Sequence, residues 1–179
     1  MKAVHLTARD FLRQPWKNGG GFTTELAVQA DGDRWLWRVS VAEVATSGAF
    51  SDFSGYDRTI MLLEGDGMEL DIDGASTLLD RPHVPFAFDG GAATTCRLLG
   101  GPVRDLNVMV DRSRARASVV VAGSGTLPCD SRWNLAYALE RCRLSGHDLA
   151  TGELLQVEGM HEPPLEIAGR IALIRIDTK

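Results

Sequence analysis

The sequence lacks paired cysteines and long apolar runs, the features that mark disulfide-rich and membrane-spanning proteins. The three cysteines, Cys96, Cys129 and Cys142, form no C-x-x-C pair and leave an odd one over, which disfavours a disulfide framework. No stretch approaches the roughly 20 apolar residues of a membrane helix, and the N-terminus has no apolar run of signal-peptide length. We therefore expect buried thiols and a cytoplasmic protein without a membrane partner.

Lysine and clustered positive charge are also scarce. Lysine occurs only as Lys2, Lys17 and Lys179, the net charge is −5, and the arginines are scattered along the chain. A nucleic-acid-binding surface needs basic residues gathered on one face, so we expect no DNA or RNA partner. Arginine suits bidentate capture of carboxylates where it points into a pocket.

Histidines are few and isolated in the sequence. A metal-binding β-barrel typically carries H-x-H on one strand with a glutamate a few residues on, and this pattern is absent. The four histidines are His5, His83, His147 and His161, and the last three lie in turn-like segments that favour exposed or capping roles. We expect no metal and no cofactor. Serine-hydrolase, P-loop and dinucleotide motifs are absent as well.

Short apolar or alternating runs separated by turn residues recur along the chain, which is typical of an all-β sandwich or barrel. In 68–73, Met68, Leu70 and Ile72 alternate with acidic residues, as on a strand with one wet face. Little helix is expected beyond 7–14, which Thr7 would cap and Pro15 would end. The other predicted strands are 22–29, 35–44, 59–63, 94–99, 105–110, 116–121, 135–144, 153–158 and 170–176.

A weak internal repeat relates 59–99 to 135–176, because both run through a strand, a glycine turn, further strands and a proline-containing connection. This favours two fused β-barrel halves, about 1–115 and 116–179, within one compact unit of 1–179, with strand exchange between the halves left open. A single irregular sandwich is the alternative.

The two halves are expected to unfold together, because neither is long enough to be comfortably stable alone. Differential scanning calorimetry should therefore show one transition, and two well-separated transitions would contradict this expectation.

A glycine-rich run at 15–25 is the first candidate for a pocket rim. Three consecutive glycines are costly to order, so a folded protein usually uses them for positive φ or close backbone approach. Thr23 and Glu25 would share one strand face, with Lys17 and Asn18 just before the bend. A solvated surface turn is the alternative.

Two later segments also place polar groups among apolar neighbours. On 35–44, Arg38 would share a face with Leu36, Ser40 and Ala42, either reaching solvent or paired inside. On 105–110, Asp105, Asn107 and Met109 alternate with aliphatic residues, which suggests a lined cavity or the wet face of an antiparallel strand.

Four blocks of the chain resemble the HutD/Ves family. They are P-W-K-N-G-G-G-x-T-x-E at 15–25, W-R-x-S at 37–40, G-x-F-S-x-F-x-G-x-x-R at 48–58 and G-P-x-x-D-x-N-x-M at 101–109. The resemblance implies a double cupin without the metal-binding histidines of ordinary cupins. It also implies a link to histidine catabolism, through binding of a small anionic metabolite such as urocanate or formylglutamate. A homodimer is a possible assembly.

Carried over residue by residue, the resemblance implies a ligand site without assigned catalytic residues. Arg38 or Arg58 would meet a carboxylate. Asn107, Glu25 and Asp105 would orient an N–H group of the ligand or hold the arginines in place. Trp16 and Phe50 are candidate walls, with core packing as the alternative for Phe50. The implied ligand-binding residues are Lys17, Asn18, Thr23, Glu25, Arg38, Ser40, Arg58, Asp105 and Asn107.

Two other functions stay open. In a metal-free isomerase or lyase, Glu25 or Asp105 would be a general base with a raised pKa, whereas a carboxylate that only anchors an arginine would be ion-paired. A structural or partner-binding module would show an exposed apolar patch and no cavity.

Overall fold

A computed structural model describes residues 2–159 and 161–179, with the side chains of 2 and 161–163 left out. Every regular element in this part of the chain is a β-strand. No helix among the described residues is long and apolar enough to cross a membrane. The chain divides into two compact units, a first unit of Leu12–Arg114 and a second unit of Met1–Phe11 with Ala115–Lys179.

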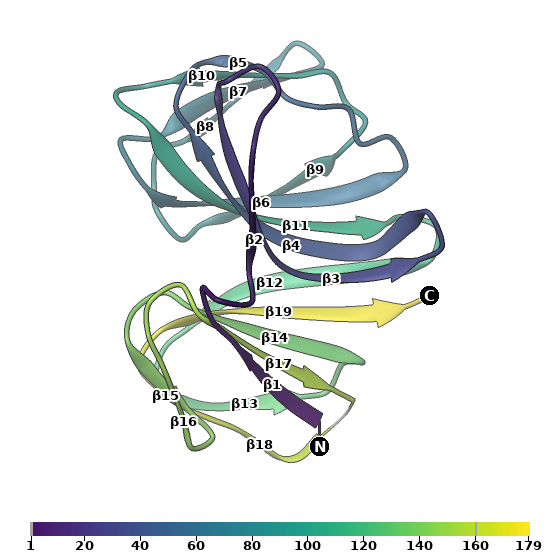
Figure 1. The fold of residues 1–179 in the computed structure, drawn as a ribbon, viewed down its shortest axis with the longest axis vertical. Helices are drawn as coiled ribbons and strands as arrows, with labels where there is room; N and C mark the ends of the chain where they lie inside the picture. The colour runs from purple at the N-terminus through teal and green to yellow at the C-terminus, as the bar shows by residue number, and fades with distance from the viewer. Residues whose placement is uncertain (1, 160) are drawn as a thin grey trace. The chain divides into compact units, whose positions relative to one another are not determined.

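The first unit contains two antiparallel sheets (Figure 1). The six-stranded sheet has the order β2 (Leu12–Pro15), β3 (Gly21–Asp31), β4 (Arg34–Val44), β11 (Val103–Asp111), β6 (Tyr56–Glu64) and β9 (Pro85–Asp89). The four-stranded sheet has the order β5 (Gly48–Ala49), β10 (Thr94–Leu98), β7 (Met68–Ile72) and β8 (Ala75–Leu79).

The second unit is built in the same way. Its five-stranded sheet has the order β1 (Lys2–Leu6), β17 (Leu154–Glu158), β14 (Trp133–Ala138), β19 (Ile171–Thr178) and β12 (Ala115–Ala122). Its four-stranded sheet has the order β13 (Gly125–Cys129), β18 (His161–Ala168), β15 (Cys142–Leu144) and β16 (His147–Leu149). The N-terminal strand β1 thus pairs with β17, the purple and green ribbons that lie side by side in Figure 1.

The predicted repeat is present as a repeated set of strand pairings. The pairs β4·β11, β5·β10, β6·β9, β6·β11, β7·β8 and β7·β10 recur eight strands later as β12·β19, β13·β18, β14·β17, β14·β19, β15·β16 and β15·β18. Eight strands in two sheets form a jelly-roll half. The prediction of two β-barrel halves is confirmed, and the single irregular sandwich is wrong.

Two local predictions are wrong. The expected helix at 7–14 is instead a turn, closed by the Asp10 N–H donating to the Thr7 carbonyl at 2.9 Å, followed by β2. In addition, the Thr7 N–H donates a hydrogen bond to the Asp10 carboxylate. These local hydrogen bonds compete with those of a helix. The single strand expected at 135–144 is two strands, β14 and β15.

The interiors of the two units differ in polarity. The second unit holds a buried apolar cluster that includes Leu144, Leu149, Leu155, Leu165 and Ile167. The three cysteines are free and buried, as predicted. In the first unit an apolar cluster that includes Ile60, Leu62, Met68 and Leu70 fills only part of the interior. Polar side chains occupy the rest, and they form the candidate site.

Candidate ligand-binding site

A cavity of about 510 Å³ lies in the first unit. Its polar lining residues are Gln14, Lys17, Asn18, Thr23, Arg38, Ser40, Ser51, Arg58, Asp105 and Asn107. Its walls are Pro15, Trp16, Ala42, Val44, Ala49, Phe50, Phe53 and Met109. A concave site with apolar walls and a few convergent polar groups is the usual form of a small-molecule pocket.

The floor of the cavity is the inward face of the six-stranded sheet. Asp105, Asn107 and Met109 alternate along β11, and the side chains between them are buried on the opposite face of the sheet. Antiparallel register places Asn107 opposite Ser40 of β4 and Met109 opposite both Arg38 and Arg58. The alternation predicted for 105–110 is therefore the lining of a cavity, and the wet-face alternative is wrong.

The glycine run forms one rim of the cavity. Gly19 has a φ of +71°, and a Cβ on Gly21 would lie 2.1 Å from the Glu43 carbonyl oxygen of β4. The backbone therefore uses these glycines for positive φ and close approach, as predicted. The Asn18 side chain accepts a hydrogen bond from the Gly20 N–H at 2.9 Å, which fixes the bend that holds Lys17 and Asn18 at the cavity.

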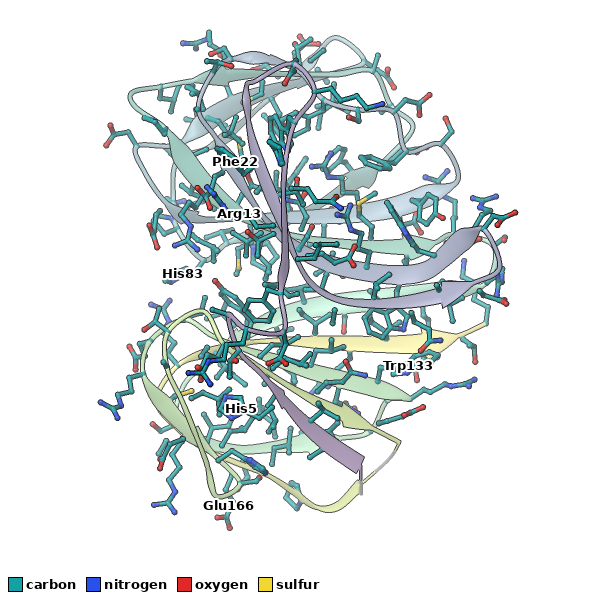
Figure 2. The ribbon with its side chains drawn as sticks, viewed as in Figure 1. His5, Arg13, Phe22, His83, Trp133 and Glu166 are labelled. Atoms are coloured by element: carbon teal, nitrogen blue, oxygen red, sulfur yellow. The ribbon has the colours of Figure 1, made fainter. Side chains whose placement is uncertain are left out.

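The preceding strand β2 holds this rim from outside. The Arg13 guanidinium lies 3.8 Å from the centroid of the Phe22 ring, with both residues labelled in Figure 2, and it pairs with Glu43 at 3.1 Å. On the inner side, the Trp16 indole N–H donates to the Thr23 hydroxyl at 2.8 Å. These contacts place the Trp16 ring as a wall of the cavity.

Arg38 is paired inside the unit. Its Nε donates to Glu25 Oε2 at 2.8 Å, and its guanidinium lies 4.6 Å from the centroid of the Trp35 ring. Strict alternation along 35–44 predicted that Trp35 and Arg38 lie on opposite faces of the strand. This prediction is wrong, because the two side chains are in contact. The pairing of β3 with β4 shifts register between Gln29 and Ala30, so that Leu36 is skipped. A β-bulge of this kind reverses the alternation beyond it.

Arg58 is held by an amide and by aromatic rings. Its Nε and Nη2 both donate to Asn107 Oδ1, at 2.8 and 2.6 Å. Its guanidinium lies 4.7 Å from the Phe50 centroid and 5.4 Å from the Phe88 centroid, which favours a buried cation. The hydrogen bonds of the described residues leave Nη1 of Arg58 unused, so a planar donor group remains for a ligand.

Asp105 has no exposed surface. Its Oδ1 accepts a hydrogen bond from Asn107 Nδ2, and its Oδ2 is buried with no partner among the described residues. Burial raises the pKa of Asp105 to about 6, and the Arg58 charge and the Asn107 hydrogen bond only partly oppose this. Burial lowers the pKa of Arg58, partly offset by the charge of Asp105, and the Arg38 charge lowers it further.

The structure brings the nine predicted site residues together around one cavity. Eight of them line it, and Glu25 lies behind the lining, where it binds Arg38. Sequence reasoning missed Gln14, Phe53 and Phe88 as neighbours of the polar groups. Phe53 was within reach, because it stands inside the G-x-F-S-x-F-x-G-x-x-R block. No pattern marked Phe88, which comes from the edge strand β9.

The cavity does not suit a metal ion. Lys17, Arg38 and Arg58 are cationic and Asp105 is the one carboxylate among the described lining residues, none of which is a histidine. Among the side chains that the structure describes, no three His, Cys, Asp or Glu residues are grouped to hold a metal. His5 and His147 are less isolated than in sequence, since their ring centroids lie 6.5 Å apart. The side chain of His161 lies outside the described residues.

Comparison with known proteins gives close relatives over nearly the whole chain. The family model described as HutD matches residues 8–173. A 21.2 kDa protein in the hutC 3' region of Pseudomonas putida is 38% identical and covers 96% of this chain and 95% of its own length. The structure of HutD from Pseudomonas fluorescens SBW25 is 34% identical, with a TM-score of 0.93 over 99% of this chain and 100% of that one.

A more distant structure bears on the fold alone. An oxalate decarboxylase variant from Bacillus subtilis has a TM-score of 0.64 and 9% sequence identity, covering 99% of this chain and 77% of that one. The predicted double-cupin fold is confirmed.

Proposed function

Because this chain belongs to the HutD family, we propose that it is a small-molecule-binding regulator of histidine utilisation whose cavity binds a small carboxylate. The observation that carries the proposal is Arg58, a nearly buried guanidinium at the cavity with an unused planar donor group. Charge-assisted hydrogen bonds to a carboxylate in such a partly desolvated place are strong. The location of the Pseudomonas putida relative beside hutC supports the link to histidine utilisation.

The second arginine supports the same ligand class. Arg38 and Arg58 both lie opposite Met109, on the two neighbouring strands of β11. Their Cα atoms are therefore separated by two strand spacings, about 10 Å. The side chains can approach a ligand of urocanate or formylglutamate size from two sides. Trp16 and Phe50 supply apolar walls for its carbon skeleton.

The enzyme alternative has one observation in its favour and one against it. Asp105 has the raised pKa that is expected of a general base. Glu25 does not fit this role, because its carboxylate is paired with Arg38. A general base must, however, come within hydrogen-bond reach of the proton that it removes. Asp105 has no exposed surface, so its unpartnered oxygen does not meet a bound ligand directly, although a solvent proton can still reach it through local opening. These contacts favour binding over catalysis.

Calorimetric titration with urocanate, formylglutamate and glutamate tests the proposal, with the amide of urocanate as a neutral match. We expect one site per chain for at least one carboxylate. The amide should bind roughly 10- to 100-fold more weakly, since it loses a charged hydrogen bond of about 1.5–3 kcal/mol. Equal affinity for acid and amide would contradict the proposal. Recovery of the unchanged ligand by NMR supports binding, whereas its conversion would support the enzyme.

A further inference from the structure

Asp105 is a buried carboxylate that the anion-binding role of the cavity leaves unexplained. It stands opposite a bulge in β6, because Arg104 pairs with Glu64 and Asp105 pairs with Leu62, which leaves Leu63 unpaired. The described contacts include no direct ion pair between Asp105 and Arg58. The two are joined through Asn107, whose Oδ1 accepts from Arg58 and whose Nδ2 donates to Asp105.

The charged and titratable groups near Asp105 come from several strands and from the rim of the cavity. Arg58 of β6 and Cys96 of β10 interact electrostatically with Asp105, and Arg38 of β4 and Lys17 of the rim line the same cavity. Burial raises the pKa of the Cys96 thiol to about 11, so this group stays neutral. Glu25 on β3 is occupied by Arg38. With no histidine among the described lining residues, Asp105 is the group placed to change charge near neutral pH.

We propose that Asp105 takes up a proton from solvent when a carboxylate binds at Arg58, so that the cavity takes in the anion and a proton together. This inference rests on the proposed function. Because Arg38 is already paired with Glu25, a bound carboxylate and an ionised Asp105 would both depend chiefly on Arg58 in a poorly solvated place, and their repulsion favours the neutral acid. The proton goes to Oδ2, because Oδ1 already accepts the Asn107 hydrogen bond.

The sign of the pH dependence follows by linkage. The pKa of Asp105 is about 6 in the free protein, and a bound anion raises it further. Carboxylate affinity is then greatest below about pH 6 and falls as the pH rises, by at most tenfold per unit for one proton. Between pH 5.5 and 8 we expect a loss of roughly 10- to 100-fold in affinity.

Titration calorimetry with formylglutamate is the test, because ordinary carboxyl groups titrate near pH 4 and this ligand keeps its charge above about pH 5.5. Repeating the titration at pH 7 in bis-Tris and in Tris, which differ in ionisation enthalpy and are not anions, measures the proton uptake of the wild type directly. We expect a large fraction of one proton per ligand. Asp105→Asn should show no uptake and an affinity independent of pH.

Asp148→Asn is the matched control, since Asp148 is 75% exposed and is not a lining residue. It should behave as the wild type. Formylglutamate binding without proton uptake, or uptake that persists in Asp105→Asn, would overturn this inference and leave the proposed function standing. If no carboxylate binds between pH 5.5 and 8, the proposed function and this inference fall together.

Discussion

Replacing Arg58 by alanine is expected to weaken carboxylate binding by about 2–4 kcal/mol, which is roughly 30- to 1,000-fold. The guanidinium is nearly buried, and its Nε and Nη2 are fixed on Asn107. Its remaining donors therefore meet a ligand at little cost in side-chain order. Titration calorimetry of the wild type and Arg58→Ala with the tightest-binding carboxylate measures the effect.

Arg58→Lys should have an affinity between those of the wild type and Arg58→Ala. Lysine keeps the charge but loses the planar fork that contacts both Asn107 and a carboxylate. Arg170→Ala is the control, because Arg170 is exposed and belongs to the second unit. Equal affinities for wild type and all three variants would remove Arg58 as the anion anchor.

Substituting alanine for Gly21 is expected to cost about 3 kcal/mol of unfolding free energy, the upper part of the usual range for overpacking. The added Cβ would lie 2.1 Å from the Glu43 carbonyl oxygen and 3.2 Å from Trp16 Cε3. The first obstacle is the backbone of the paired strand β4, so no side-chain rotation can relieve it. Urea unfolding of the wild type and the variant measures the loss.

Gly48→Ala is the matched control in the same unit. Gly48 also lies in a strand, but a Cβ there would meet no atom within 4 Å. The change should therefore alter stability by less than about 0.5 kcal/mol. A Gly21→Ala protein as stable as Gly48→Ala would contradict the close approach at the rim.

Strict alternation made much of the fold and site predictable. Every second residue of an otherwise aliphatic strand is polar or a methionine, and these residues line the cavity: Asp105, Asn107 and Met109. The predicted strands of 94–99 and 105–110 lie close to the observed β10 and β11. The glycine run was informative because three successive glycines are costly to order. A folded protein uses them mainly where the backbone needs positive φ or a close approach.

The remaining features depend on contacts distant in sequence. The strand β1 gains its partner from β17, about 150 residues away, and no local pattern in 2–6 specifies it. Trp35 meets Arg38 because a bulge skips Leu36, and bulges follow from strand pairing rather than from composition. Asn107 was expected to hold an arginine in place, but the sequence did not specify which arginine it binds. Its two hydrogen bonds from Arg58 require the register of β11 against β6.

A crystal structure of the protein with a bound carboxylate, urocanate or formylglutamate, tests the central claim most directly. We predict that the carboxylate lies in the cavity of the first unit, with an oxygen about 2.7–2.9 Å from an Nη atom of Arg58. The Asn107 bridge to Asp105 should be retained. A ligand bound in the second unit, or bound in this cavity with its carboxylate away from Arg58, would contradict the account.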